Sequence, residues 1–222
     1  MFERMIRLIG KDKFKSLQKL NVLVVGLGGV GGYAFEALVR AGIKNITIID
    51  GDKVEESNLN RQIITSNKNI GLPKVEVAKN RGLEINSEVN VDAREFFITE
   101  DNFNEIMDKK YDYVIDACDD LVVKFLLIKN SNKYKLVSSM GTANKFDPSK
   151  FEITTLDKTI NDPIARILRK RVKDAHLHRK FKVVSSTEVP VKNENLGTNS
   201  YIPGIAGLMC ASYVINDITK KK

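Results

Sequence analysis

A glycine-rich turn is the first part of the sequence whose residue types and spacing could do chemistry. Gly26, Gly28 and Gly31 form the pattern G-x-G-x-x-G, and Gly29 lies inside it. Glycines in such a turn allow tight curvature, close approach of a phosphate to the backbone and close packing of the next helix on the preceding strand. The N–H groups at the start of that helix can bind phosphate oxygens. The turn therefore predicts a nucleotide-binding site.

An acid at the end of the following apolar run supports this prediction. Asp50 is placed where such sites accept hydrogen bonds from a ribose. The alternative is a tight turn with a purely structural role. If a nucleotide binds, this much of the sequence fits NAD and ATP equally, so the choice depends on the residues that follow.

Charged and polar residues after Asp50 favour a triphosphate. The β- and γ-phosphates of ATP extend past the helix end and need cations, and usually a magnesium ion. Arg61 offers a planar fork and Lys74 a point charge for these phosphates. A solvated lysine in a first helical turn is the alternative for Lys74, although cations are disfavoured there. The predicted nucleotide contacts in this stretch are Asp52, Ser57, Asn58, Arg61, Gln62 and Lys74.

Two further carboxylates, Asp119 and Asp120, follow an apolar run and lie at its expected carboxyl end. Ligands bind at this edge of open α/β sheets. Carboxylate oxygens suit Mg²⁺, so Asp119 is the predicted metal ligand. For Asp120 the alternative is an N-cap of the helix that begins at Leu121.

Alternating strands and helices must position these residues. We expect strands at 21–25, 45–50, 89–97, 111–117 and 135–139, with helices at 30–41, 73–86, 102–108 and 121–131. This alternation predicts an α/β fold with a Rossmann-like, doubly wound, mainly parallel sheet and helices on both faces. We expect antiparallel additions at 151–156 and 182–188, helices at 163–173 and 204–219, and a mobile loop at 189–203.

The expected domain organisation is one domain over 1–222. A helical arm at 1–20 precedes a nucleotide-binding core at 21–145, and a substrate-binding part follows at 146–222. The 222 residues carry a net charge of +8, and most of the excess positive charge is in the C-terminal part. There are 13 basic and 7 acidic residues after residue 150. Such a field attracts a polyanion such as nucleic acid, although a solvated helix face is the alternative. The predicted RNA contacts are Arg166, Arg169, Lys170, Arg171, Lys173, Arg179 and Lys180.

Composition excludes several classes of protein. The apolar runs are far shorter than the ~20 residues of a membrane-spanning helix, and no apolar leader follows Met1, so we expect a cytoplasmic protein without a membrane span. Two cysteines, Cys118 and Cys210, exclude a disulfide framework and a four-thiolate zinc site. Both are expected to be packed side chains. The lysines at 220–222 are expected to be a solvated end.

Taken together, the glycine turn, the acids, Lys74 and the run Ser-Asn-Leu-Asn-Arg-Gln at 57–62 resemble the ThiF/MoeB/HesA superfamily. The resemblance covers about the first 145 residues. It implies that ATP activates a carboxylate as an acyl adenylate, with release of pyrophosphate. It also implies a homodimer in which an N-terminal arginine, here Arg4, reaches the partner's active site, with surface charge as the alternative for Arg4.

The C-terminal part is similar to one branch of this superfamily, the tRNA threonylcarbamoyladenosine dehydratases. The matching stretches are 157–163, 184–188 and 203–207, together with the basic helix. This resemblance implies adenylation of a carboxylate on a tRNA adenosine, followed by ring closure. It allows a monovalent cation, Na⁺ or K⁺, and a sulfur-relay protein partner. Alternatives are adenylation of a sulfur carrier's C-terminal glycine, a nucleotide-binding regulatory module and an NAD-dependent oxidoreductase.

Overall fold

The computed structural model describes residues 1–219, so the lysines expected to form a solvated end lie outside the described residues. The strands are β1 (Asn21–Val25), β2 (Asn45–Ile49), β3 (Asn90–Arg94), β4 (Tyr113–Asp116), β5 (Lys135–Ser139), β6 (Phe151–Thr154) and β7 (Lys182–Ser186). The α-helices are α1 (Glu3–Ile9), α2 (Lys11–Gln18), α3 (Gly31–Ala41), α4 (Lys74–Ile85), α5 (Phe103–Met107), α6 (Leu121–Lys129), α7 (Pro163–Asp174) and α8 (Ile202–Thr219).

The seven strands form one sheet in the order β3-β2-β1-β4-β5-β7-β6. All neighbouring pairs are parallel except β6 and β7, which confirms the predicted mainly parallel α/β fold. β6 and β7 were both expected as antiparallel additions. They are antiparallel to each other, but β7 also runs parallel to β5. Helix α7, which connects β6 to β7, returns the chain to the edge of the sheet at which the parallel strands begin.

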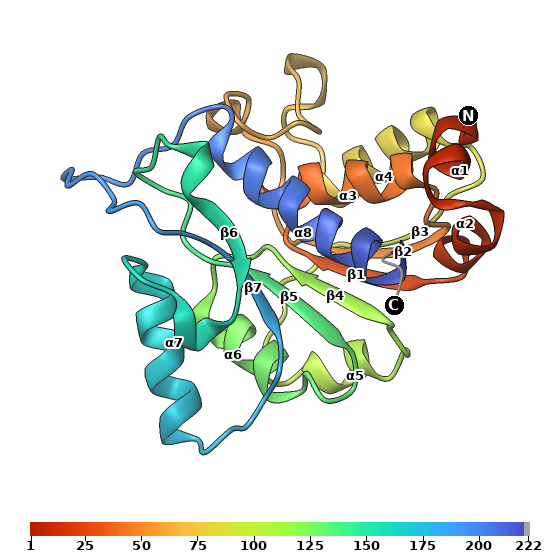
Figure 1. Ribbon diagram of the computed structural model, residues 1–222. Coiled ribbons are helices and arrows are strands. Elements are labelled where there is room, and N and C mark those ends of the chain that lie inside the picture. Colours follow the sequence, from red (N-terminus) through yellow and green to blue (C-terminus); the bar gives the residue numbers. More distant parts are fainter. Residues whose placement is uncertain (220–222) are drawn as a thin grey trace.

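Apolar, β-branched runs form the inner strands because both faces of the sheet are covered. In β1, the residues from Val22 to Val25 are all buried. Helices α3, α4 and α8 lie on one face of the sheet, and α5, α6 and α7 lie on the other (Figure 1). Each layer has its own apolar cluster against the sheet.

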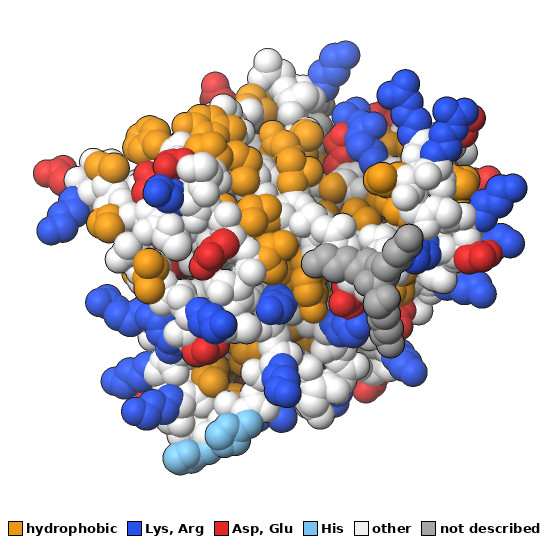
Figure 2. Space-filling view, viewed as in Figure 1, with side chains coloured by type: hydrophobic (Ala, Val, Ile, Leu, Met, Phe, Trp, Pro, Cys, Tyr) orange, Lys and Arg blue, Asp and Glu red, His pale blue; other side chains and the backbone are white. Residues whose placement is uncertain are grey.

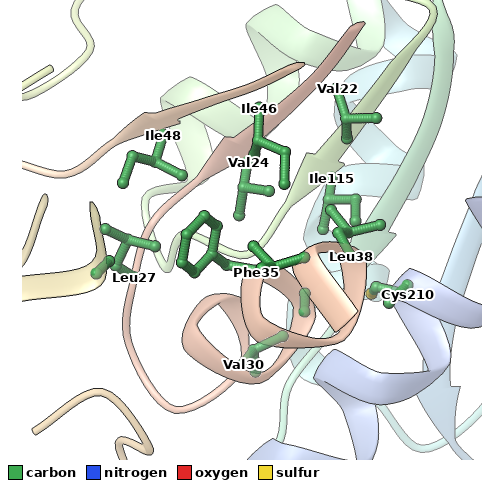
Figure 3. Close-up of a cluster of buried hydrophobic side chains, with 14 of the residues drawn as sticks. Val22, Val24, Leu27, Val30, Phe35, Leu38, Ile46, Ile48, Ile115 and Cys210 are labelled. Atoms are coloured by element: carbon green, nitrogen blue, oxygen red, sulfur yellow. The ribbon is translucent and has the colours of Figure 1, made fainter. Parts of the chain in front are cut away.

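The larger cluster lies between the sheet and helices α3 and α8. Val24 and Ile115 point from the sheet toward Phe35 and Leu38 of α3, and Cys210 of α8 lies at the side of this cluster (Figure 3). Cys210 is fully buried, so its interpretation as a packed core residue is confirmed.

The N-terminal segment is helical, as expected, but forms two short helices. Gly10 separates α1 from α2 with a φ of +86°, a conformation that favours glycine. Phe14 and Leu17 of α2 are buried, and the ring of Phe14 lies close to Gly42 at the end of α3. α2 is therefore packed against the domain.

Helix α8 crosses α3 at two glycines. A methyl group added at Gly207 would lie 2.1 Å from the Val30 carbonyl oxygen, and one at Gly204 would lie 2.9 Å from the Tyr33 ring. Among the described residues, α8 is the one helix long and apolar enough to cross a membrane. Its buried face packs on α3 and the sheet, as a core helix does.

Candidate functional site

A cleft of about 720 Å³ opens at the carboxyl ends of β1, β2, β4 and β5. The strand order reverses between β1 and β4, and ligands of open α/β sheets bind at such a switch point. The turn after β1 forms one wall of the cleft, and Leu196, Gly197 and Thr198 line another part of it. The sequence therefore brings distant segments to one edge of the sheet.

The glycine turn has the conformation that its spacing predicts. Gly26 has a φ of +85°, and an added methyl group there would lie 2.8 Å from the Ala117 carbonyl oxygen. At Gly31 an added methyl would lie 1.8 Å from the Gly26 carbonyl oxygen, so this glycine allows helix α3 to pack on the turn. Gly28 and Gly29 line the cleft, and at Gly28 the nearest atom to an added methyl is 3.9 Å away. Gly28 therefore leaves open space for a ligand.

Asp50 fixes this turn and also lines the cleft. Its two carboxylate oxygens accept hydrogen bonds from the backbone N–H groups of Leu27 at 2.6 Å and Asp52 at 2.8 Å. Burial raises the pKa of Asp50, and the two backbone hydrogen bonds act in the opposite direction. The carboxylate lies beside the turn, where a ribose contact is expected.

Lys74 is buried in the wall of the cleft at the first position of α4, with 5% of its surface exposed. Its Nζ donates to the Asp52 carboxylate at 2.7 Å. The alternative of a solvated lysine is therefore wrong. Because the Asp52 side chain is 53% exposed, this ion pair joins an enclosed cation to an open, solvated carboxylate.

The 57–62 run contributes three residues to the cleft: Asn58, Arg61 and Gln62. The Arg61 guanidinium donates to the carbonyl oxygen of Ser57 at 2.7 Å. The side-chain oxygen of Asn58 accepts from the Glu55 N–H at 3.2 Å, which closes a short 3₁₀ turn. The Ser57 side chain is exposed and does not line the cleft, so its backbone orients Arg61.

Asp119 and Asp120 both line the cleft, but they differ in their partners. One oxygen of Asp120 accepts from the N–H groups of Val122 at 2.6 Å and Val123 at 3.1 Å. Asp120 is therefore the N-cap of α6, which was the alternative to metal binding. Asp119 is exposed at the cleft. The described residues contain no cluster of three or more His, Cys, Asp or Glu that could hold a metal ion by itself.

A buried ion pair that was not predicted from the sequence lies beside the cleft, and its Lys124 is among the cleft-lining residues. The Lys124 Nζ donates to both oxygens of Asp116 at 3.1 Å and to the Ser139 carbonyl oxygen at 2.8 Å. Burial alone would lower the pKa of Lys124, but the Asp116 carboxylate outweighs it and the net shift is upward. A lysine inside the apolar run of α6, LVVKFLLIK, is the sequence signal for this pair.

Cys118, beside this pair, lines the cleft. Its Sγ lies 3.1 Å from Asp116 Oδ1. Burial, and then the charge of Asp116, raise the pKa of the thiol well above its ordinary value. A thiol held protonated is a weak nucleophile, which agrees with the interpretation of Cys118 as a packed residue.

The remaining predicted site residues lie outside the cleft. Arg4 is exposed on α1 and is not among the cleft-lining residues of this chain. Three arginines of the basic stretch, Arg169, Arg171 and Arg179, donate to the carbonyl oxygens of Thr159, Leu121 and Lys129. These arginines anchor α7 and the turn after it.

The remaining cations of this stretch, Arg166, Lys170, Lys173 and Lys180, are exposed. Figure 2 shows basic side chains gathered at the lower left, over α7. Ile164, in the first turn of α7, lines the cleft. The basic helix therefore begins beside the nucleotide cleft.

Comparison with known proteins identifies the class of protein to which this fold and cleft belong. The ThiF family model matches residues 2–222, and the chain belongs to the ThiF family. A tRNA threonylcarbamoyladenosine dehydratase from Bacillus subtilis is 35% identical over 240 residues, covering 99% of this chain and 94% of the relative.

The crystal structure of the E. coli tRNA N6-threonylcarbamoyladenosine dehydratase TcdA in complex with ATP matches with a TM-score of 0.93 and 37% identity. That match covers 98% of this chain and 93% of the other. A sulfur carrier protein adenylyltransferase from Thermus thermophilus is 35% identical over 119 residues, 54% of this chain and 44% of that relative. Similarity to the dehydratases therefore spans the whole chain, whereas similarity to this adenylyltransferase covers about half of it.

Proposed function

We propose that this protein is an ATP-dependent enzyme that dehydrates threonylcarbamoyladenosine in tRNA. The observation that carries the proposal is the extent of the similarity: named dehydratases match both the nucleotide-binding part and the C-terminal part. The cleft supports it, because residues predicted for ATP binding from five separate segments meet there. An oxidoreductase would not need Arg61 and Lys74 at this place.

The proposed reaction has two steps. The substrate carboxylate attacks the α-phosphorus of ATP, which forms an acyl adenylate and releases pyrophosphate. The neighbouring ureido group then attacks the activated carbonyl carbon, loses a proton and expels AMP, so that the substrate loses one water overall. Because nucleophile and electrophile belong to one molecule, their effective concentration is high and no enzyme thiol is needed. The raised pKa of the Cys118 thiol agrees with such a mechanism.

Binding and charge neutralisation are the tasks of this chain's residues. The N–H groups of the glycine turn face the phosphates, and Asp50 accepts from the ribose. Lys74 and Arg61 stabilise the negative charge that develops at the α-phosphate, where placed cations and donors act most strongly. Asp52 and the Ser57 carbonyl oxygen hold these two cations in position at 2.7 Å each.

Magnesium fits this site only together with ATP. Mg²⁺ typically binds one or two carboxylates together with substrate phosphates and water, so the exposed carboxylate of Asp119 at the cleft would serve as its protein ligand. When bound, the ion would neutralise phosphate charge. The family resemblance also leads us to propose a monovalent cation, Na⁺ or K⁺.

The proposal extends to partners and location. The family resemblance leads us to propose a homodimer. In it Arg4, which lies outside the cleft of its own chain, would reach the cleft of the partner subunit. A sulfur-relay protein partner and a cytoplasmic location belong to the same proposal.

The test is to incubate the protein with ATP and tRNA that carries threonylcarbamoyladenosine, followed by mass spectrometry of the nucleosides. We expect the modified nucleoside to lose the mass of one water, and only when ATP is present. An unchanged mass from a protein that binds ATP would contradict the proposal. Release of pyrophosphate on adding a carrier protein with a C-terminal glycine, but not on adding the tRNA, would favour sulfur-carrier adenylation.

A further inference from the structure

Two exposed aromatic side chains, Phe146 and Tyr201, lie on neighbouring segments beside the cleft. Phe146 is 59% exposed and Tyr201 is 44% exposed, although large aromatic side chains are usually more buried. The Tyr201 hydroxyl donates to the Phe146 carbonyl oxygen at 3.1 Å, which places the two residues side by side. We call this pair the aromatic platform.

Hydrogen bonds fix the backbone under the platform. The Glu188 carboxylate accepts from the Phe146 N–H at 3.0 Å and from the Asp147 N–H at 2.9 Å. The side-chain oxygen of Asn199 accepts from the Tyr201 N–H at 3.2 Å, and its amide donates to the Lys145 carbonyl oxygen at 3.0 Å. The two rings are therefore displayed on ordered backbone.

A second clamp joins the same two segments closer to the cleft. Asn144 has a φ of +57°, and its N–H donates to the Gly197 carbonyl oxygen at 2.8 Å. In return, its side-chain oxygen accepts from the Gly197 N–H at 2.7 Å. A backbone conformation that is rare for a residue other than glycine marks a position held by its surroundings. The segment at 189–203 was expected to be a mobile loop, but its last two residues belong to α8, and these contacts hold the loop at 189–201 against the segment after β5.

The platform is continuous with the cleft along both segments. Ala143, three residues before Phe146, lines the cleft, and so does Thr198, three residues before Tyr201. Leu196 also lines the cleft while 86% of its surface is exposed. Figure 2 shows hydrophobic side chains at the left of the molecule, on the side where the loop before α8 projects in Figure 1.

Charge indicates the kind of partner. The exposed cations Arg166, Lys170 and Lys173 lie on α7, which begins at the cleft through Ile164. A basic surface combined with exposed aromatic rings is the usual arrangement of proteins that bind unpaired nucleobases, because rings stack on bases while cations bind the backbone. Helix α7 and the loop before α8 both lie at the left of the molecule in Figure 1, and an apolar protein partner gives no reason for cations there.

From this arrangement we propose that Phe146 and Tyr201 stack against unpaired nucleobases next to the adenosine whose threonylcarbamoyl group enters the cleft. The inference rests on the proposed function, since it assigns the RNA contact that holds the modified loop at the site. Base stacking on an aromatic side chain is tolerant of sequence. The platform therefore contributes affinity for the loop, and the cleft selects the modified nucleoside.

The experiment measures binding of an RNA stem-loop that carries threonylcarbamoyladenosine, by fluorescence anisotropy at several salt concentrations. We expect Phe146→Ala and Tyr201→Ala each to weaken binding about tenfold, within the range for loss of one base stack. The slope of log Kd against log salt should not change, because no cation is removed. Phe146→Tyr keeps the ring and should bind as the wild type does. Tyr201→Phe keeps the ring but loses the hydrogen bond to the Phe146 carbonyl oxygen, so it should lose less affinity than Tyr201→Ala.

A second readout detects stacking directly. With 2-aminopurine placed beside the modified adenosine, wild-type protein should change its fluorescence and the two alanine variants should change it less. ATP affinity should stay within twofold of the wild type in every variant, which also serves as the check on folding.

Three outcomes would overturn the platform. These are unchanged RNA affinity in both alanine variants, an equal loss of affinity in the ring-keeping variants, or a change of oligomeric mass in light scattering without a change in RNA affinity. The last outcome would assign the rings to a contact between subunits. Dehydration of tRNA by the wild type tests the proposed function separately, so either idea can fail without the other.

Discussion

Lys74 is buried at the side of the cleft, so its amine is placed to bind a ligand and also pairs with a residue of the fold. Its amine pairs with Asp52, whose carboxylate is mostly exposed, so the cation stays enclosed with little carboxylate desolvation. We expect Lys74→Met to slow ATP-dependent pyrophosphate release at least about 100-fold, comparable to loss of one placed donor at a developing charge. A continuous pyrophosphate assay in the presence of modified tRNA measures this.

The matched control is Lys79→Met on the same helix. It removes the same charge from a position outside the cleft and should leave the rate within twofold of the wild type. Equal losses in the two variants would mean that net charge, and not the placed amine, sets the rate.

Gly28 and Gly31 belong to the same turn, but substitution by alanine should have different effects at the two positions. Gly28→Ala places its methyl group in open space, 3.9 Å from the nearest atom, on the cleft side. It should leave the free energy of unfolding nearly unchanged and weaken ATP binding at least about tenfold, because the methyl occupies space needed by phosphate. Calorimetric titration with ATP and urea unfolding measure the two quantities.

Gly31→Ala should instead lower the free energy of unfolding by about 3 kcal/mol, since its methyl would overlap the Gly26 carbonyl oxygen. If Gly28→Ala destabilised the fold as much as Gly31→Ala, the division between a ligand-facing and a packing glycine would be wrong.

At the scale of elements, the Asp116–Lys124 pair joins the ends of β4 and β5 to helix α6. Both side chains are almost fully buried, and removing one partner of such a pair leaves an uncompensated charge. We expect Lys124→Met to lower the free energy of unfolding by about 3 to 5 kcal/mol, measured by urea unfolding.

The double variant with Asp116→Leu and Lys124→Met tests the cause. With both charges gone, most of the lost stability should return, because apolar pairs often replace buried ion pairs without loss. If the double variant is as unstable as the single one, packing of the lysine stem, and not its charge, is what the fold requires.

Helix α7 has two kinds of cation, and only one kind is free to meet RNA. Arg169 and Arg171 are bound to backbone carbonyl oxygens, whereas Arg166, Lys170 and Lys173 are exposed. Changing the three exposed residues to Ala should weaken tRNA binding and lower the slope of log K against log salt by about one for each phosphate that these cations bind. Filter binding at several salt concentrations measures the slope.

The control removes three exposed lysines from the N-terminal region: Lys11, Lys15 and Lys19. The net charge falls equally, so a similar change of slope in this variant would show that α7 is only a solvated face.

The extent of sequence-based prediction also differs by element. The glycine turn, the parallel strands and α4 were predictable because their signals are local: β-branched runs, glycine spacing and a proline before Lys74. The anchoring of Arg169 and Arg171 was not predictable, because it depends on carbonyl oxygens far along the chain. The clamp of Asn144 on the loop at 189–201 was missed for the same reason.

At the scale of the whole molecule, α8 supports the nucleotide turn from the far end of the sequence. Gly207 approaches the Val30 carbonyl oxygen, and Pro203 lies against Gly29. Gly207→Ala should therefore lower both the free energy of unfolding and the ATP affinity, since its methyl pushes α8 away from the turn. Leu208→Ala, at a neighbouring exposed position, is the control and should change neither. Thermal unfolding with and without ATP measures both effects, and loss of stability alone would show that the turn does not depend on α8.

This support has a consequence for biosynthesis. A growing chain that has emerged as far as β5 holds the complete phosphate turn, but its helix α3 still lacks the partner that buries one side. Until α8 is made, the apolar face of α3 around Ala34 and Leu38 is open to solvent and to other chains. Incomplete chains with such surfaces tend to aggregate. We therefore expect the nascent protein to need protection late in translation, and its capacity to capture ATP to appear only once α8 has emerged.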